Sequence, residues 1–128
     1  MAKLIIVITE QLAFVKEISH TLRQAEYFVL KGNHPEHVIE MIKSMIPDMI
    51  IIDEVFGKDT LITFSQQVHL NSHTKTTSVV ALVSTSSDKV KHEFSSHGIK
   101  AVISRDDLLK KPLQLISNLM LNGNGSSS

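Results

Sequence analysis

The chain has 128 residues, 42% of them hydrophobic and 20% charged, which suits one ordinary globular domain and excludes two domains of usual size. Thirteen Lys and Arg residues balance thirteen Asp and Glu residues, which excludes a strong overall field favouring nucleic acid or anionic membrane. The absence of cysteine excludes disulfides, thiolate metal sites and a cysteine nucleophile, and fits a reducing compartment. The first apolar run, residues 4–8, is too short for a signal sequence or a membrane span, so we expect a cytoplasmic protein.

Short apolar runs alternate with segments of helical period along the chain, which is the pattern of repeated βαβ units. The first run indicates a strand buried on both faces, as in a parallel sheet, and the second indicates an edge strand. The sequence therefore predicts one doubly wound α/β domain over residues 1–121. Its five expected strands are residues 4–8, 27–30, 49–53, 79–83 and 101–104.

Five helices are expected to alternate with these strands. The first spans residues 10–25, and the fourth spans residues 88–97 and ends with Gly98 at its C′ position. A turn at residues 31–33 leads into the second helix. The apolar positions expected to face inward are, helix by helix, Leu12, Val15, Ile18 and Leu22; Val38, Ile39, Ile42 and Met45; Leu61, Phe64 and Val68; Val90 and Phe94; and Leu113, Ile116 and Leu119.

Prolines and small residues mark the remaining boundaries. Pro35 is expected to begin the second helix and Pro47 to end it, because proline lacks an amide hydrogen and restricts the residue before it. Pro112 suits a helix start better than a helix interior, so we predict a loop or broken turn at residues 106–111. The tail at residues 122–128 consists of Asn, Gly and Ser, has nothing to bury, and is predicted to be a disordered tail or linker.

An apolar strand that stops on a carboxylate is the most informative local feature. Pro47 and Asp48 lead into the strand that ends in Asp53, and a flexible-looking loop at residues 54–59 follows. In open parallel α/β sheets, ligands bind at the carboxyl ends of the strands, which places Asp53 where chemistry is expected. The same aspartate would also suit a turn or a helix cap with no chemical role.

Several of these features together resemble the receiver domain of two-component response regulators. They are the order of elements, the opening Lys-Leu-Ile-Ile-Val at residues 3–7, Asp53 at the end of the third strand, and Gly98 before the fifth strand. The resemblance covers residues 1–121. It implies a flavodoxin-like five-stranded parallel sheet in the order 2-1-3-4-5 with helices on both faces. It also implies that Asp53 occupies the phosphoacceptor position and that the domain is not itself an enzyme.

The metal site of the family is where the sequence departs most from the pattern. Receivers carry an acidic pair directly after the first strand to hold Mg²⁺, and the matching positions are Ile8 and Thr9, with Glu10 just beyond. Mg²⁺ requires near-octahedral oxygen ligands and usually one or two carboxylates. Only Asp53, with Glu10 if any, remains to bind a metal. We therefore expect no cofactor, or Mg²⁺ only if phosphorylation is retained.

Two further family positions are altered, one in the expected pocket and one on the expected partner surface. The hydroxyl that ends the fourth strand falls on Val83, or on Ser84 if the alignment slips by one residue, and the aromatic switch position of the fifth strand falls on Val102. A valine at the hydroxyl position cannot form the hydrogen bond to the charged phosphoryl group, and such a bond stabilises by about 1.5–3 kcal/mol. The sequence therefore indicates that the coupling machinery of the family is absent.

The family's lysine position has two candidates. Counted from Gly98 it falls on Arg105, and Lys111 with Pro112 resembles the family's Lys-Pro dipeptide more literally but lies seven residues past the predicted strand end. We favour Arg105, which keeps the charge and adds a bidentate fork. We expect it to form an ion pair with Asp53 across the pocket, in place of a bound cation.

The favoured interpretation is a divergent pseudo-receiver, a protein-interaction module in phosphorelay signalling with weakened or lost phosphorylation. Its partner would be a histidine kinase or a downstream effector domain, with no direct binding of nucleic acid or membrane, and a homodimer is left open.

The first alternative is a working phosphoacceptor that uses Asp53 with Glu10 and backbone carbonyls. A flavodoxin-like nucleotide or flavin binder is remote, since no phosphate-binding glycine motif occurs and only one tyrosine is available. The residues expected on the partner surface are Lys89, Lys91, His92, Val102, Arg105 and Lys111.

Overall fold

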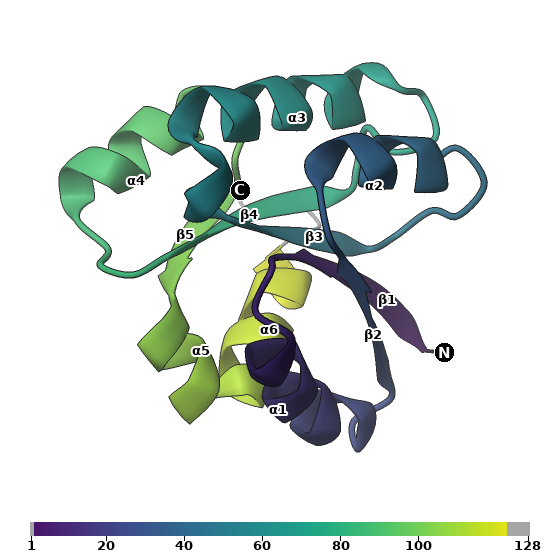
Figure 1. Cartoon of the computed structure of the whole chain (residues 1–128), viewed down its shortest axis with the longest axis vertical. Helices are drawn as coiled ribbons and strands as arrows, with labels where there is room; N and C mark the ends of the chain where they lie inside the picture. The colour runs from purple at the N-terminus through teal and green to yellow at the C-terminus, as the bar shows by residue number, and fades with distance from the viewer. Residues whose placement is uncertain (1, 123–128) are drawn as a thin grey trace.

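A five-stranded parallel sheet with helices on both faces forms the centre of the computed structural model, which describes residues 2–122 (Figure 1). The strand order is β2-β1-β3-β4-β5, and every neighbouring pair is parallel. This confirms the predicted flavodoxin-like fold, including the edge position of β2. The strands are β1 (Lys3–Ile8), β2 (Tyr27–Gly32), β3 (Met49–Asp53), β4 (Ser78–Val83) and β5 (Ala101–Ser104).

Helices cover the sheet in two layers of three (Figure 1). The helices α2, α3 and α4 lie on one face, and α1, α5 and α6 lie on the other. Their bounds are α1 (Leu12–Arg23), α2 (Pro35–Met41), α3 (Lys58–Leu70), α4 (Asp88–Ser95), α5 (Arg105–Lys110) and α6 (Pro112–Asn122), with a 3₁₀ turn η1 (Glu54–Phe56) between β3 and α3.

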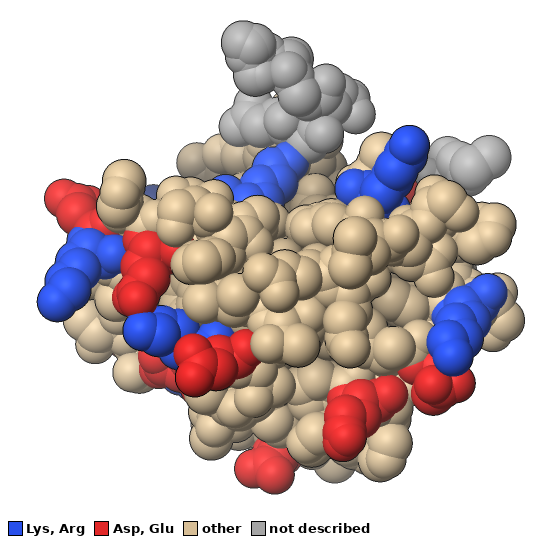
Figure 2. Space-filling model, turned by 90° about the horizontal axis from the view of Figure 1, so that it is seen from above, with Lys and Arg blue, Asp and Glu red and all other residues tan. Residues whose placement is uncertain are grey.

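Two apolar cores, one on each face of the sheet, hold the layers together. The central strands are buried on both faces, so successive residues such as Ile51 and Ile52 contribute to opposite cores. Phe64 of α3 is the largest fully buried side chain of the first core, and Ile116 of α6 is fully buried in the second. Outside these cores, acidic and basic side chains are interspersed on the face seen in Figure 2, which shows no large patch of one sign among the described residues.

The first helix is shorter than predicted at both ends, since it spans Leu12–Arg23 and not residues 10–25, and one of its predicted core residues is wrong. It begins at Leu12 rather than at residue 10, and Leu12 is 51% exposed, whereas Phe14 is buried. The buried stripe of α1 is centred on Val15, Ile18 and Leu22. At 3.6 residues per turn, Phe14 lies at one edge of this stripe, about one turn before Ile18, and Leu12 lies beyond the opposite edge.

The second helix is shorter than predicted, because it ends at Met41 and not at Pro47. The residues after it form hydrogen-bonded turns, including Ser44 N to Met41 O at 3.2 Å, and Ile42 remains buried in the core. The turn predicted at residues 31–33 begins later, since β2 continues to Gly32. A Cβ at Gly32 would lie 2.5 Å from Val38 Cγ2, so α2 can approach the end of β2 only at a glycine.

The predicted loop at residues 106–111 is wrong, because this segment contains α5. The Ser104 hydroxyl caps α5 by accepting a hydrogen bond from Asp107 N at 3.1 Å, and Asp106 and Asp107 lie in the first turn, where carboxylates favour a helix. Pro112 begins a separate helix, as expected. The prediction of five helices is therefore one short. Of the tail, Asn122 is the last residue of α6, and residues 123–128 lie outside the described part of the chain.

Gly98 takes its predicted C′ position after α4, although the helix itself ends at Ser95 and not at residue 97. Gly98 has φ +87°, a conformation that favours glycine, and the amides of Gly98 and Ile99 donate to the carbonyls of Ser95 and Phe94, both at 3.2 Å. These two bonds form the Schellman motif, with Gly98 at C′. Between residues 2 and 122, no helix has both the length and the apolar character needed to cross a bilayer.

Candidate functional site

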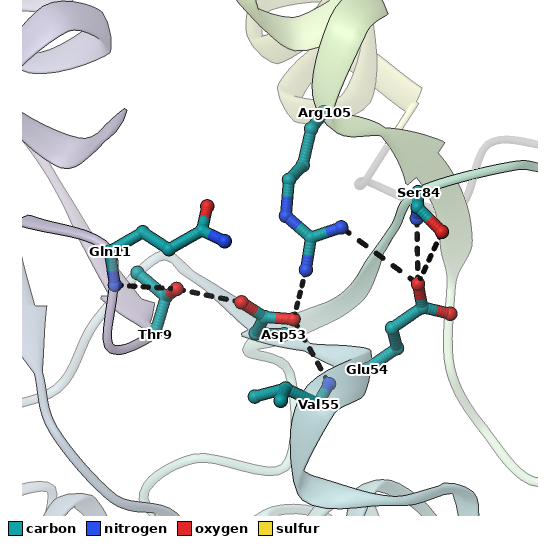
Figure 3. A network of polar contacts seen from close by, with 7 residues as sticks. All are labelled: Thr9, Gln11, Asp53, Glu54, Val55, Ser84 and Arg105. Carbon is teal, nitrogen blue, oxygen red and sulfur yellow. Dashed lines mark hydrogen bonds and ion pairs between the residues drawn. The ribbon is translucent and has the colours of Figure 1, made fainter. Parts of the chain in front are cut away.

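Asp53 lies at the carboxyl end of β3 and is only 1% exposed, yet its carboxylate is fully engaged by donors (Figure 3). Its Oδ2 accepts a hydrogen bond from Thr9 Oγ1 at 2.7 Å. Its Oδ1 accepts from Val55 N at 3.0 Å and from the guanidinium of Arg105. A buried carboxylate is tolerated only when it is paired and hydrogen-bonded, and these three donors meet that requirement.

Arg105 reaches Asp53 from the first position of α5, directly after β5. Its side chain is 19% exposed and lies between two carboxylates: one terminal nitrogen, Nη2, donates to Asp53, and the other, Nη1, lies 3.8 Å from Glu54 Oε2. The ion pair expected between Arg105 and Asp53 is therefore present. Lys111, the other candidate for the family's lysine, is exposed just beyond the end of α5.

Glu54 is a pocket residue that the sequence analysis missed. It is the first residue of η1, and its Oε2 accepts hydrogen bonds from Ser84 N at 2.7 Å and from Ser84 Oγ at 2.9 Å (Figure 3). Ser84 thus binds Glu54, with no hydrogen bond to Asp53 among the described residues. The one available signal was its position, since Glu54 follows Asp53 at the edge of the sheet where β4 and β5 also end.

Other residues predicted for the pocket or the partner surface lie elsewhere. Val83 is 1% exposed and packs in the core beneath α2, α3 and α4, so it contributes nothing to the pocket surface. Glu10 is exposed, and no hydrogen bond or ion pair links it to the other described residues. Val102 was predicted on the partner surface, but its side chain is 8% exposed because it packs into the same core as Val83.

The donor set around Asp53 does not suit a divalent cation. Ile8 is a fully buried apolar residue and offers no ligand, and Thr9 directs its proton at Asp53. Arg105 already places a positive charge against Oδ1 of Asp53. Across residues 2–122, no cluster of three or more His, Asp or Glu residues has the geometry of a metal site. Mg²⁺, with its need for several oxygen ligands, does not fit these residues.

A groove of about 440 Å³ runs between α4 and β5, on the side of the molecule that carries the expected partner surface. Lys91 and His92 line it and are exposed, and Lys89 lies exposed on the same helix. Lys100, also in the groove, donates from Nζ to Leu119 O at 2.9 Å, and burial lowers its pKa below 10.5. Among the residues that the structure describes, no acidic side chain lines this groove.

Comparison with solved structures finds response regulators that share this architecture. A putative response regulator from Chloroflexus aurantiacus aligns with a TM-score of 0.81 at 16% identity, covering 94% of this chain and 99% of that one. The chemotaxis response regulator CheY4 of Vibrio cholerae aligns with a TM-score of 0.74 at 22% identity, covering 91% and 99%. The Mn²⁺-bound form of response regulator Rcp1 aligns with a TM-score of 0.70 at 13% identity, covering 91% of each chain.

The sequence itself matches no protein-family model and no curated protein. Because the identities to the solved structures are low, their likeness describes the fold. The chain has the fold of response-regulator receiver domains.

Proposed function

We propose that the protein is a divergent receiver module that acts by binding a partner protein, with Mg²⁺-dependent phosphorylation of Asp53 weakened or lost. The observation that carries this proposal is the occupancy of the Asp53 carboxylate. Both of its oxygens accept hydrogen bonds, from Thr9 and Val55 N, and Arg105 supplies the balancing charge. The receiver scaffold is kept, and an internal cation already balances the charge of this carboxylate.

Phosphoryl transfer to Asp53 would have to displace these contacts. A carboxylate oxygen would form the new bond to phosphorus while the bond from phosphorus to the leaving group of the donor breaks. Metal ions normally neutralise the charge that develops on the transferring phosphoryl oxygens. Arg105 offers one positive charge there, but the same charge is already paired with Asp53, which makes the carboxylate a weaker nucleophile.

The partner surface proposed for this module is the exposed side of α4 beside β5. Lys89, Lys91 and His92 are exposed there, and the groove next to them carries no acidic side chain. Such a surface favours an acidic partner segment, since charge complementarity steers association and fixes its register. A histidine kinase or a downstream effector domain is the class of partner that this function implies, and the module itself would catalyse no reaction.

A working phosphoacceptor is the second candidate function. One observation favours it: Asp53 ends β3 at the edge of the sheet where ligands are expected, with a hydroxyl, Ser84, just after β4 and a cationic residue, Arg105, just after β5. In this function Arg105 would turn from Asp53 to the incoming phosphoryl oxygens, and Glu54 would have to release Ser84.

Incubation with acetyl phosphate and Mg²⁺, followed by intact-mass analysis, separates the two functions. The proposal predicts little or no phosphoryl adduct on the wild type under conditions that fully modify an ordinary receiver run in parallel. The Asp53→Asn variant is the matched control for modification at other residues. An adduct as abundant in the wild type as in the ordinary receiver, and absent from Asp53→Asn, would refute the proposal and support the phosphoacceptor.

A further inference from the structure

One oxygen of Glu54 collects donors from the ends of two other strands (Figure 3). Its Oε2 lies 2.7 Å from Ser84 N and 2.9 Å from Ser84 Oγ, both just after β4, and 3.8 Å from Arg105 Nη1, just after β5. A backbone amide, a hydroxyl and a guanidinium that converge on one point form a binding position for an oxyanion. The chain fills this position with its own carboxylate.

The contact with Glu54 holds the start of the segment that leads into α4. Ser84 is the first residue after β4, and at the other end of the segment the Ser87 hydroxyl caps α4 by accepting a hydrogen bond from Val90 N at 3.2 Å. The helix itself is lightly anchored, because Phe94 is its only buried residue. Polar contacts at the entry of α4 therefore have a large share in fixing its position.

A second ion pair reaches α4 from the same part of the chain. Lys58, the first residue of α3, donates to Glu93 of α4 with 2.7 Å between Nζ and Oε2. Residues 54–58, which directly follow Asp53, therefore contact α4 or its entry at two points. Arg105 in turn touches both Asp53 and Glu54, so the pocket and the entry of α4 form one continuous set of polar contacts.

We propose that Glu54 is the resident anion of this site and that, by binding Ser84, it keeps residues 84–87 and α4 in one arrangement without covalent modification. The inference rests on the proposed function in one respect, since it takes α4 as the partner surface. Lys89, Lys91 and His92 would then be presented to the partner in a constant geometry. Loss of Glu54 would release the segment even though Asp53 remains unchanged.

Amide hydrogen exchange, measured by NMR on the whole chain, tests this inference at Ser84. In Glu54→Ala the Ser84 amide is expected to exchange about tenfold faster, because it loses a hydrogen bond to a charged acceptor. Glu54→Gln, which keeps an acceptor oxygen and loses the charge, should give a smaller increase. Chemical-shift changes should extend from Ser84 into α4. Glu17→Ala, which removes an exposed glutamate of α1, is the matched control and should leave Ser84 unchanged.

Wild-type protection of the Ser84 amide in Glu54→Ala would overturn the inference, and so would shift changes that stop at residue 84. If Glu54→Ala does not fold, Ser84→Ala gives a second test, because it removes the hydroxyl alone and should shift the side-chain carboxyl resonance of Glu54. An unchanged Glu54 resonance would also overturn it. Phosphorylation of Asp53 in the wild type to the extent of an ordinary receiver would refute the proposed function and leave the Ser84 result standing, so the two failures are distinguishable.

Discussion

Arg105, directly after β5, places its guanidinium against the buried carboxylate of Asp53 at the end of β3, although β4 separates these two strands in the sheet. The pair therefore links the ends of two strands that are not neighbours. Because Asp53 is almost fully buried, its charge depends on this partner and on the donors from Thr9 and Val55. Arg105 is in this sense the internal cation of the site.

Removal of Arg105 should destabilise the protein strongly. Breaking a buried pair by removing one partner costs about 3–5 kcal/mol, and we expect Arg105→Met to fall at about 3 kcal/mol because Thr9 and Val55 N still bind Asp53. Urea denaturation measures this loss of unfolding free energy, provided that the dependence of the free energy on urea concentration is the same in both proteins. Arg105→Lys, which keeps the charge, should lose less, and Asp53→Asn combined with Arg105→Met should recover part of the loss. Equal stability of wild type and Arg105→Met would show that the pair has no structural role.

Partner binding should depend on α4 and not on the acceptor carboxylate. Reversing the charges of Lys89 and Lys91 to Glu is expected to weaken binding of a purified acidic partner at least about tenfold, mainly through lost charge complementarity. Asp53→Asn should leave the affinity within about twofold, since no aspartyl phosphate carries the signal. Calorimetric titration of the same partner into both variants measures this. The opposite ranking of the two variants would contradict the proposed function.

Two glycines should be sensitive to alanine for different reasons. Gly98→Ala forces an L-residue into φ +87° and should cost about 1–2 kcal/mol, and Gly32→Ala brings a methyl group against Val38 and should cost about 1–3 kcal/mol. Gly57 also has a positive φ of 97°, but a Cβ there would meet nothing within 4 Å. Thermal unfolding of Gly57→Ala therefore isolates the backbone cost. An unchanged unfolding temperature of Gly32→Ala would contradict the packing argument.

The pair of Lys58 and Glu93 predicts how the contact between α3 and α4 depends on pH. The hydrogen bond from Lys58 lowers the pKa of Glu93 below 4.5, and the same bond raises the pKa of Lys58 above 10.5. The lowered carboxyl pKa means that the contribution of Glu93 is present above pH 4.5 and is lost as the pH falls through its folded value. The raised ammonium pKa means that the contribution of Lys58 is present below pH 10.5 and is lost as the pH rises through its folded value.

An NMR titration of the Glu93 side-chain carboxyl checks this prediction. Lys58→Met should raise the pKa of Glu93 toward its ordinary value. Lys43→Met is the matched control, because Lys43 pairs with Glu40 on α2 and has no contact with Glu93 among the described residues. An unchanged Glu93 titration in Lys58→Met would show that the ion pair does not form in solution.

The strands were predictable from the sequence because buried parallel strands are nearly continuous apolar runs, and all five lie within two residues of their predicted ends. The helix α5 was missed for a specific reason. Pro112 was taken to require a loop before it, but proline at a first helical position needs only a one-residue break, here at Lys111. The start signal was present, in Ser104 as the cap and Asp106 and Asp107 in the first turn.

The site was predictable where strand order decides it, and not where side-chain direction decides it. The pairing of Arg105 with Asp53 follows from two strand ends at one edge of the sheet. The contact between Glu54 and Ser84 depends on η1, which turns Glu54 toward β4, and a residue beyond the end of a strand no longer follows the period that fixes its direction. A loop was expected at this position, so no direction for Glu54 could be assigned.

Titration of Mg²⁺ into the whole chain, followed through the amide resonances of Thr9, Asp53 and Arg105, tests the central claim most directly. Because Thr9, Val55 N and Arg105 already bind the Asp53 carboxylate, we expect these three resonances to show no saturable shift at millimolar Mg²⁺, whereas those of an ordinary receiver titrated in parallel saturate. A saturable shift centred on Asp53, abolished in Asp53→Asn, would show that the pocket binds the cation and would contradict the account.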